Sequence, residues 1–452
     1  MNLKPLFSLS LISSALLLAA CGSDSDSSSS SSNNMDDDGH DHGASARILM
    51  TSGNSNDLTI FDQADDKFEA LGQAAAMSGE LIRSDDGLSA AVVTAKGVEF
   101  VYSGIHAEEH DEGEEHEEGE EHEEGEEHEE GEEHSETHDA EILTALTLTG
   151  ADLKVSMTQN HFAVLNGGNT QFYPAAELEE ATEPEATLTL TDVTQTYPAA
   201  ILDEEHGLRL VFANGKATVY EGTEATDTVQ DCKSPIAVVK AHEMTLAQCD
   251  TGLIAVVVEE HEHAEEAHAE EESAAEDEPN IETPAIDLGT LAVSKLVSNG
   301  HKAVAVGAGI ELKSVTWMDD QVKIADMAFA SEAPNATAIC DVNFATADTK
   351  AGILTDNGLL HFIDLKTGAA RFATLNDSND SATCEDWALT SGPQSFTVTD
   401  SDVGKMYYID SHDGHPYHIH EKFPMDAGTD VAAAAMLHAS GVEDDHDHDH
   451  DD

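Results

Sequence analysis

Basic residues are scarce in this sequence. Its 452 residues include 19 Lys or Arg against 92 Asp or Glu, which gives a formal net charge of −73. Nucleic acids and anionic lipid surfaces repel such a chain, so the charge excludes them as electrostatic partners and favours cations. The apolar share of 40% is nevertheless too high for a wholly disordered chain. The excess acid must therefore be concentrated in particular segments.

Long apolar runs are also missing beyond the first 20 residues, because no later stretch approaches the ~20 residues that a membrane-spanning helix needs. Residues 1–20 combine Lys4 with a short apolar core and small residues, which is typical of a secretion signal. Cys21 follows Leu-Ala-Ala and resembles the cysteine of bacterial lipoprotein signals, which implies cleavage before Cys21 and its lipidation. The alternative is an ordinary signal peptide that contains a cysteine.

Gly22 follows the cysteine and favours the outer membrane over retention at the inner membrane. We therefore expect a protein of the bacterial cell envelope that is lipid-anchored and faces the periplasm. Its anchor is followed by a Ser/Asp-rich tether over residues 21–45.

CxxC pairs are absent as well. Apart from Cys21, the cysteines are Cys232, Cys249, Cys340 and Cys384. In an oxidising compartment an even number predicts disulfides, and four cysteines allow three pairings. We favour the local pairing of Cys232 with Cys249 and of Cys340 with Cys384. A thiolate metal site is the alternative, which the lack of a CxxC pair disfavours.

A short strand rich in β-branched and aromatic residues recurs eight times, each time after a glycine or a polar turn. Its instances are residues 56–62, 96–102, 169–173, 215–220, 251–257, 309–312, 358–364 and 404–410. Such a spacing is typical of a β-propeller with one four-stranded blade per repeat. We predict an all-β fold, a single eight-bladed propeller over residues 46–440. Seven blades is the alternative because the repeat at Gly309 is weak, and two sandwiches would not repeat so evenly.

Much of the acid lies in segments that alternate with histidine. Residues 106–139, 259–278 and 443–452 hold 38 of the 92 acids and no Lys or Arg. Like charges at this density repel, so we expect disordered insertions at 106–139 and 259–278 and a His/Asp tail at 441–452. Imidazole with carboxylate is a ligand set for borderline divalent ions, and the alternative is a solvated acidic loop with incidental histidine. The candidate ligands are His106, His110, His116, His122, His128, His134, His138, His261, His263, His268, His412, His415, His418 and His420.

Both insertions follow the third strand of a blade, and residues 412–420 occupy the same position in the eighth repeat. Successive strands alternate in direction, so these loops and the turns between first and second strands emerge on one face. Four such turns carry His161, His206, His242 and His301. We predict a ring of metal ligands around the mouth of the propeller; the alternative is that polar residues simply belong in turns.

At the level of pattern, residues 46–440 resemble the AztD-like periplasmic zinc metallochaperones, which are β-propellers associated with ABC-type zinc importers. The resemblance is clearest at residues 232–250, where His242 and Glu243 lie between two cysteines. It implies Zn²⁺ binding on one propeller face and handover to the solute-binding protein of the importer. Residues 197–200 are Tyr-Pro-Ala-Ala where the family leads us to expect further histidines, so the family site is incomplete or rebuilt.

These observations predict a zinc-binding metallochaperone that captures Zn²⁺ with flexible tracts and passes it from a face site to a zinc uptake system. Ligand type does not separate Zn²⁺ from Ni²⁺ or Cu²⁺. One alternative is a buffer or storage protein that does not transfer metal, and another is an interaction scaffold with solubilising acidic loops. The sequence shows no nucleophile–base constellation, so we expect no enzyme activity. Because imidazole must be neutral to bind a metal, capture should weaken as the pH falls through about 6.5.

Overall fold

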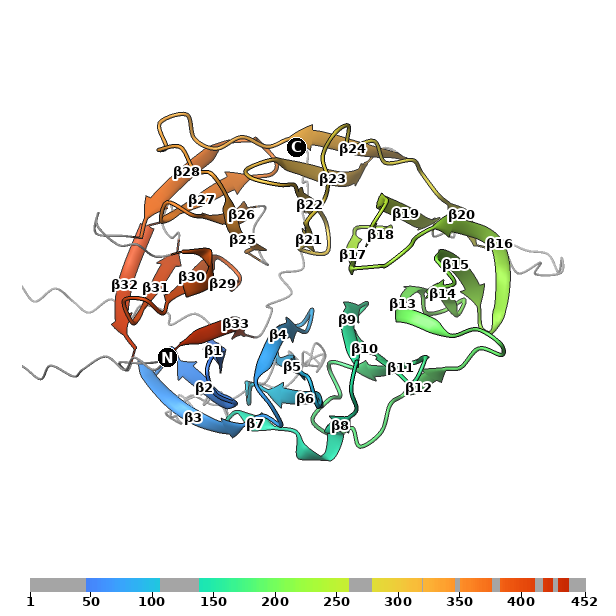
Figure 1. Cartoon of the computed structure of the whole chain (residues 1–452), viewed down its shortest axis with the longest axis horizontal. Helices are drawn as coiled ribbons and strands as arrows, with labels where there is room; N and C mark the ends of the chain where they lie inside the picture. The colour runs from blue at the N-terminus through green and yellow to red at the C-terminus, as the bar shows by residue number, and fades with distance from the viewer. Residues whose placement is uncertain are drawn as a thin grey trace, which may run out of the picture. The chain divides into compact units, whose positions relative to one another are not determined.

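The computed structural model describes residues 46–105, 138–259, 279–318, 320–345, 350–375, 383–410, 418–425 and 430–438. Contacts divide the chain into two units, Met1–His42 and Gly43–Asp452, and every described residue belongs to the second. This second unit consists of eight antiparallel sheets set around a common axis, which confirms the predicted eight-bladed β-propeller (Figure 1). None of the helices in the described ranges is long and apolar enough to cross a membrane.

Blades 2 to 5 are each built from consecutive strands that run from the axis outward. Blade 2 contains β4 (Ser78–Arg83), β5 (Ser89–Thr94), β6 (Gly97–Tyr102) and β7 (Glu141–Ile142), and after η1 (Thr144–Leu146) the short β8 (Leu148–Thr149) also pairs with β6. Blade 3 contains β9 (Lys154–Thr158), β10 (His161–Asn166), β11 (Asn169–Pro174) and β12 (Ala186–Leu188). Blade 4 contains β13 (Gln195–Asp203), β14 (Leu208–Ala213), β15 (Lys216–Glu221) and β16 (Glu224–Asp231). Blade 5 contains β17 (Ala237–Ala241), β18 (Met244–Cys249), β19 (Gly252–Glu259) and β20 (Asn280–Glu282).

Blades 6 to 8 follow the same order. Blade 6 contains β21 (Lys295–Ser298), β22 (Ala303–Val306), β23 (Leu312–Met318) and β24 (Gln321–Asp326). Blade 7 contains β25 (Ile339–Phe344), β26 (Lys350–Thr355), β27 (Leu359–Asp364) and β28 (Ala370–Thr374). Blade 8 follows η2 (Cys384–Asp386) and contains β29 (Trp387–Ser391), β30 (Ser395–Asp400), β31 (Lys405–Asp410) and β32 (His418–Pro424).

Blade 1 joins the two ends of the propeller. Its strands are β1 (Arg47–Ser52), β2 (Asp57–Asp62) and β3 (Lys67–Gln73), with the C-terminal β33 (Val431–Leu437) added as the innermost strand. The Arg83 guanidinium of blade 2 donates to the carbonyls of Ser391 at 2.6 Å and Met436 at 3.3 Å, which ties blade 2 to blade 8 and to β33. The ring is thereby closed by backbone pairing and by the half-buried Arg83 cation.

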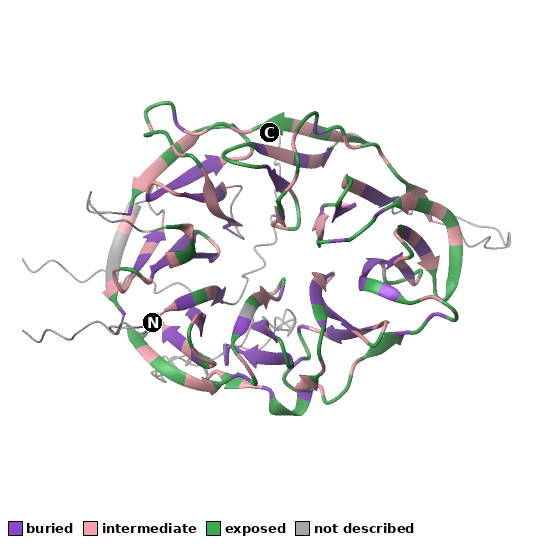
Figure 2. Ribbon diagram, viewed as in Figure 1, coloured by how far each residue is buried: buried purple, intermediate pink, exposed green. Residues whose placement is uncertain are grey.

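The core lies between neighbouring blades, because each inner strand is covered on both faces. All six residues of β6 are buried, whereas the outer strand β16 alternates between exposed and half-buried positions (Figure 2). Aromatic pairs bridge the blades, including Phe100 with Phe162 at 5.3 Å between ring centroids. The eight apolar, β-branched repeats seen in the sequence correspond to the third strands of the eight blades, counted from the axis.

Two disulfides confirm the favoured pairing. Cys232 follows β16 and bonds to Cys249 at the end of β18, so this bridge joins blade 4 to blade 5. Cys340 in β25 bonds to Cys384 at the start of η2, which leads into blade 8. Loops of this size reduce the entropy of the unfolded chain by an amount worth about 3–4 kcal/mol each.

Both acidic insertions begin where the sequence predicts, directly after the third strands β6 and β19. The expected strand at Gly309 begins only at Leu312, but it occupies the third position of blade 6 as predicted. His418 and His420 were expected in a loop, and the structure corrects this, because both lie in β32. The expected disorder of the insertions and the tail concerns residues outside the described ranges.

Candidate metal centre

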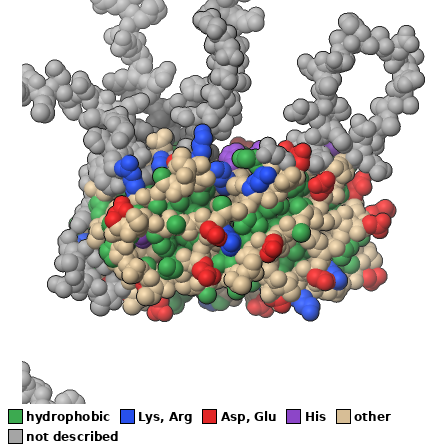
Figure 3. All heavy atoms as spheres, turned by 90° about the horizontal axis from the view of Figure 1, so that it is seen from above, with side chains coloured by type: hydrophobic (Ala, Val, Ile, Leu, Met, Phe, Trp, Pro, Cys, Tyr) green, Lys and Arg blue, Asp and Glu red, His purple; other side chains and the backbone are tan. Residues whose placement is uncertain are grey.

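The connection between the first and second strands of a blade is called here its first turn. First turns and third-to-fourth connections lie on the same face of the propeller, which we call the turn face, because successive strands are antiparallel. The structure places His161, His206, His242 and His301 in or at the end of the first turns of blades 3, 4, 5 and 6, as predicted. An edge-on view shows histidine side chains along one face of this unit (Figure 3).

His161 is the first residue of β10 and is only 8% exposed. The turn before it is tight, with positive φ at Gln159 (40°) and Asn160 (56°), the conformation of a type I′ hairpin turn. Its neighbours hold this turn in place: the Gln159 side chain donates to the Leu202 carbonyl of blade 4 at 2.8 Å. From blade 2, the Asp85 carboxylate accepts from the Asn160 amide at 3.2 Å. Three blades therefore fix the position of the His161 backbone.

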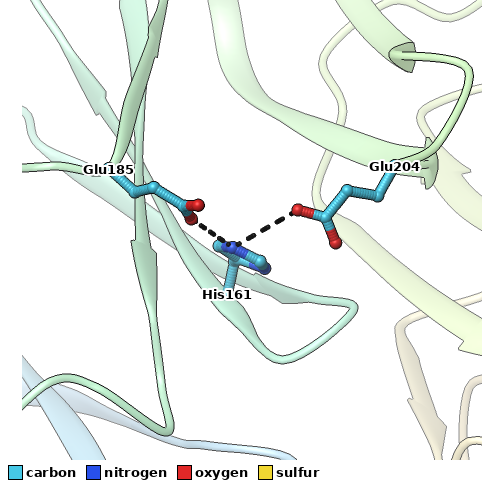
Figure 4. A group of neighbouring side chains, drawn as sticks. All are labelled: His161, Glu185 and Glu204. Atoms are coloured by element: carbon cyan, nitrogen blue, oxygen red, sulfur yellow. Dashed lines mark hydrogen bonds and ion pairs between the residues drawn. The ribbon is translucent and has the colours of Figure 1, made fainter.

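Two carboxylates face the His161 ring (Figure 4). Glu185 lies directly before β12, with its Oε2 2.9 Å from His161 Nε2. Glu204 follows β13 in the first turn of blade 4, with its Oε1 4.0 Å from the same nitrogen. Among the described residues, these three form the single group of His, Cys, Asp and Glu side chains whose ligand atoms all lie within 4.8 Å of one another.

The hydrogen bond of the other ring nitrogen, Nδ1, fixes the orientation of the His161 ring and the position of its proton. Nδ1 lies 2.8 Å from the carbonyl oxygen of Gln159, which only accepts hydrogen bonds, so Nδ1 carries a proton. The Nε2 atom then either carries a second proton toward Glu185 or offers its lone pair to a cation between the carboxylates. Metal-binding histidines characteristically donate their second N–H to a carbonyl in this way, which fixes ring orientation.

The spacing suits an ion of zinc size after small side-chain movements. Zinc binds imidazole and carboxylate at about 2.0–2.2 Å, so two tetrahedral ligands lie about 3.4 Å apart. The observed 2.9 and 4.0 Å lie on either side of this value. The carboxylates have half-exposed side chains, 55% for Glu185 and 57% for Glu204, so they can adjust while the imidazole stays fixed. Three protein ligands leave a fourth position open to water or to a ligand from another molecule.

An acidic hollow adjoins this group on blade 4. Its volume is about 480 Å³, and its lining consists of Glu204, Glu205, His206, Gly207, Glu221, Gly222 and Glu224. The His206 ring bonds to Asp203 Oδ2 at 2.6 Å, and this hydrogen bond raises the pKa of His206. The hollow concentrates negative charge beside the candidate centre, which increases the local concentration of cations.

One cation of the protein lies near the same carboxylates. Burial lowers the pKa of the Arg209 guanidinium, while the charges of Glu204, Asp203 and Glu185 raise it. Its Nη1 donates to the carbonyls of Asp203 and Leu208, both at 3.0 Å, and the guanidinium lies 5.5 Å from the centre of the Phe172 ring. Arg209 therefore offsets part of the negative charge that would hold a metal.

The predicted ring of ligands is not one cluster. His161 joins Glu185 and Glu204, whereas His206 pairs with Asp203 outside that group. His242 and His301 approach each other between blades 5 and 6, with ring centroids 6.5 Å apart. His138 is exposed at the end of the first insertion, where its amide donates to the Gly104 carbonyl at 2.8 Å. Eleven predicted ligands lie outside the described residues: His106, His110, His116, His122, His128, His134, His261, His263, His268, His412 and His415.

Sequence reasoning missed Glu185 and Glu204. Glu185 lies 24 residues from His161 along the chain, in a region with several acids and no distinctive spacing. Glu204 lies two residues before His206 in the same first turn. The presence of an acid and a histidine in one first turn could have identified Glu204 as a candidate ligand. Residues 197–200, where further histidines were expected, lie in the inner strand β13, and Tyr197, Ala199 and Ala200 are buried there.

No protein-family model and no curated protein matches the chain. Among solved structures, apo AztD from Citrobacter koseri superposes with a TM-score of 0.62 at 14% identity, covering 88% of this chain and 99% of AztD. A second Citrobacter koseri AztD structure gives a TM-score of 0.61 at the same identity and coverage. A weaker likeness is to dihydro-heme d1 dehydrogenase NirN, with a TM-score of 0.48 and 10% identity over 86% of this chain and 74% of NirN. In fold, the chain is thus an AztD-like, eight-bladed β-propeller.

Proposed function

We propose that this protein is a zinc metallochaperone of the bacterial envelope. In this proposal the His/Glu-rich insertions capture Zn²⁺, and the His161–Glu185–Glu204 group holds the ion for transfer to a zinc uptake system. The observation that carries the proposal is the position of this group, since it lies on the same face from which both insertions leave β6 and β19.

The His/Glu-rich insertions and the His161 group suit different tasks, capture of the ion and its retention, for physical reasons. A tract with many histidines and glutamates offers numerous weak sites that exchange quickly, which suits capture. A buried imidazole held by three blades is preorganised, so it binds without ordering a loop. Tethering makes passage between them intramolecular, at an effective concentration on the order of millimolar for a short flexible linker.

The open fourth position suits transfer. A three-ligand group accepts a ligand from a partner before it releases its own, so the ion need not return to water. The half-exposed carboxylates of Glu185 and Glu204 are the ligands that leave most easily, because they rotate into solvent while His161 is buried. We expect the partner to be the solute-binding protein of an ABC zinc importer, and we expect no catalysis by this chain.

The first experiment measures zinc affinity of the full chain by competition with a coloured chelator. Glu204→Gln removes a proposed ligand, and Glu205→Gln is the matched control because it removes the same charge from the next residue of the same turn. We expect Glu204→Gln to weaken the tightest site at least about tenfold and Glu205→Gln to weaken it no more than about twofold. Equal effects would show that only the general negative charge matters.

The second experiment tests transfer. Zinc-loaded protein is mixed with the apo solute-binding protein of a zinc importer, and movement of zinc is followed in the presence of excess chelator. Transfer to the solute-binding protein that is faster than chelation supports the metallochaperone, whereas transfer no faster than from zinc-loaded chelator supports the buffer or storage function.

The proposed lipid anchor needs its own test. Labelling of Cys21 by radioactive palmitate in a bacterial host provides it.

A further inference from the structure

The face opposite the turn face carries exposed apolar side chains on the adjacent blades 5 and 6 (Figure 1). This face holds the connections between blades and the turns between second and third strands, and we call it the linker face. Ile236 lies in the connection into blade 5, and Ile310 lies in the turn between β22 and β23 of blade 6. Their side chains are 54% and 43% exposed. Two isoleucines thus reach solvent on neighbouring blades of one face.

Hydrogen bonds connect Ile236 to the segment that joins blades 5 and 6. The Ile236 amide donates to the Gln248 carbonyl at 2.9 Å, and the Gln248 side chain donates to the Val293 carbonyl at 2.9 Å. Gln248 is buried, whereas Val293 is half-buried. Ile236 and Val293 therefore lie on the two sides of one buried amide.

The same segment continues the apolar surface to Ile310. The half-buried Leu291 packs directly on Gly307, where a Cβ atom would collide with the Leu291 side chain. The Gly307 amide donates to the Glu311 carbonyl at 2.8 Å, which closes the turn that presents Ile310. Ile236, Val293, Leu291 and Ile310 thus follow one another across the blade boundary, and we call them the apolar strip.

The scaffold fixes the end of the apolar strip at Ile236. The segment that carries Ile236 begins at the disulfide between Cys232 and Cys249. The Asp250 amide also donates to the Lys233 carbonyl at 3.1 Å. A surface that is already ordered loses little conformational entropy when another molecule covers it.

Unpaired charges of opposite sign lie at the two ends of the apolar strip. Lys233 is exposed near Ile236, and Glu311 is exposed next to Ile310. Within the part of the chain that the structure describes, neither of these two charges has an ion-pair partner. Asp250 is also exposed at the Lys233 end. In a two-fold arrangement each end of the strip faces the other end on the second copy, so Lys233 meets Glu311 twice.

The acidic insertions determine which faces of two copies can approach each other. Both insertions leave β6 and β19 on the turn face. Two copies that met through their turn faces would bring these like charges together, at a large electrostatic cost. Contact between linker faces directs both insertions away from the boundary between the copies.

We propose that two copies of this chain associate through the apolar strip, with Lys233 of each copy paired with Glu311 of the other. The match of apolar side chains with complementary ends carries the proposal, since one surface then satisfies itself under two-fold symmetry. The His161 group lies on the turn face and stays accessible in such a dimer. The proposal does not rest on zinc binding or on zinc transfer.

Light scattering coupled to size exclusion measures the mass of the full chain in solution. The chain carries Cys21→Ser, which prevents lipidation and a disulfide between two copies, and EDTA removes any metal that could bridge the acidic tracts. We expect the mass to rise from one chain to two over about 1–100 µM, the range typical of a weak homodimer. A mass of one chain throughout this range would overturn the proposal.

A matched pair of variants locates the contact. Ile236→Asn removes an apolar side chain of the strip, and Met318→Asn is the control, because Met318 is 55% exposed at the end of β23 on the turn face. We expect Ile236→Asn to raise the dimer dissociation constant at least about tenfold, since a two-fold interface loses the contact twice, and Met318→Asn to leave it within about twofold. Equal effects of the two substitutions would show that the apolar strip is not the interface.

Exchange of the two charges tests the orientation of the copies. Lys233→Glu and Glu311→Lys should each raise the dissociation constant about tenfold at low salt, because each places like charges opposite one another. The variant that carries both substitutions restores opposite charges across the interface, so its dissociation constant should return to within about threefold of the wild-type value. This recovery cannot arise from a fold defect, since two damaging substitutions would then add. A double variant no better than either single variant would overturn the pairing, whatever the outcome of the zinc-transfer experiment.

Discussion

His161 and His361 are both buried, but their surroundings differ in every other respect. His161 is 8% exposed and presents Nε2 to two carboxylates, with Nδ1 bound to a carbonyl. His361 in β27 is 1% exposed, and its ring lies 4.3 Å from the Phe329 ring and 6.0 Å from the Phe372 ring, centroid to centroid. Neither nitrogen of His361 has a hydrogen-bond partner among the described residues. Burial of an imidazole alone thus does not indicate whether it can bind a metal. The groups that face its two nitrogens do.

The largest expected effects come from replacing each of these two histidines by glutamine, in separate variants. His161→Gln should weaken the tightest zinc site about 100-fold or more, equivalent to about 3 kcal/mol, since one of three ligands is lost. Its metal-free Tm should change little. His361→Gln should leave zinc affinity unchanged and lower Tm, because an amide with more hydrogen-bonding groups than neutral imidazole is placed in an apolar site without partners. Chelator competition and thermal unfolding of both variants check this, and a zinc defect in His361→Gln would break the contrast.

Acid should destabilise the propeller through His361. Burial lowers the pKa of His361 from 6.5 to about 4, so the unfolded chain takes up this proton at higher pH than the folded one. The stabilising contribution of the neutral ring is therefore complete above pH 6.5 and is lost as the pH falls toward 4. The loss amounts to about 3 kcal/mol.

The measurement is urea unfolding of metal-free protein between pH 4 and 7. His361→Phe keeps an aromatic ring beside Phe329 and Phe372 but cannot be protonated, so it should flatten this part of the profile. Parallel profiles for the variant and the wild type would mean that carboxylates account for the whole acid sensitivity.

A smaller effect on zinc affinity is expected from replacing Arg209, the cation that lies near the carboxylates beside His161. Arg209 interacts with Glu204, Asp203 and Glu185, so Arg209→Met should raise zinc affinity severalfold by removing a competing cation. The Met side chain keeps the apolar contact with Phe172. Isothermal titration of zinc checks this, and a fall in affinity would indicate that Arg209 positions the carboxylates instead of opposing the metal.

The smallest effect should follow from loosening the turn that holds His161. Gln159→Asn preserves a residue that tolerates positive φ but shortens the amide that reaches the Leu202 carbonyl. We expect zinc affinity to fall about threefold, the value of one modest hydrogen bond, with Tm within about 2 °C of wild type. An unchanged affinity would show that the Asp85 contact alone positions the turn.

Much of the fold could be read from the sequence because propeller blades are local units. Each blade pairs consecutive strands, so the eight third strands, the sites of both insertions and the two disulfide pairings followed from spacing along the chain. The same logic placed four histidines in first turns. It failed for His418 and His420, because an isolated His-rich segment gives no sign of where a strand begins.

Only one of the three residues of the candidate centre could be predicted from the sequence. His161 could be singled out as a turn histidine, but Glu185 and Glu204 come from the outer part of its own blade and from the next blade. Neither acid differs in type or spacing from many others in a chain with 92 of them. The buried His361 lies within an apolar strand, and nothing in its sequence neighbourhood reveals that two phenyl rings enclose it.

The sequence by itself predicted the propeller, its favoured count of eight blades, the favoured disulfide pairing and the face that carries histidine, because these depend on neighbours along the chain. Only the tertiary structure decided which of those histidines meet. It separated one expected ring into a His161 group across blades 3 and 4 and a His242–His301 pair across blades 5 and 6. The reason is physical: ligand atoms must approach within a few ångströms, and contacts between blades, not the order of residues within them, set those distances.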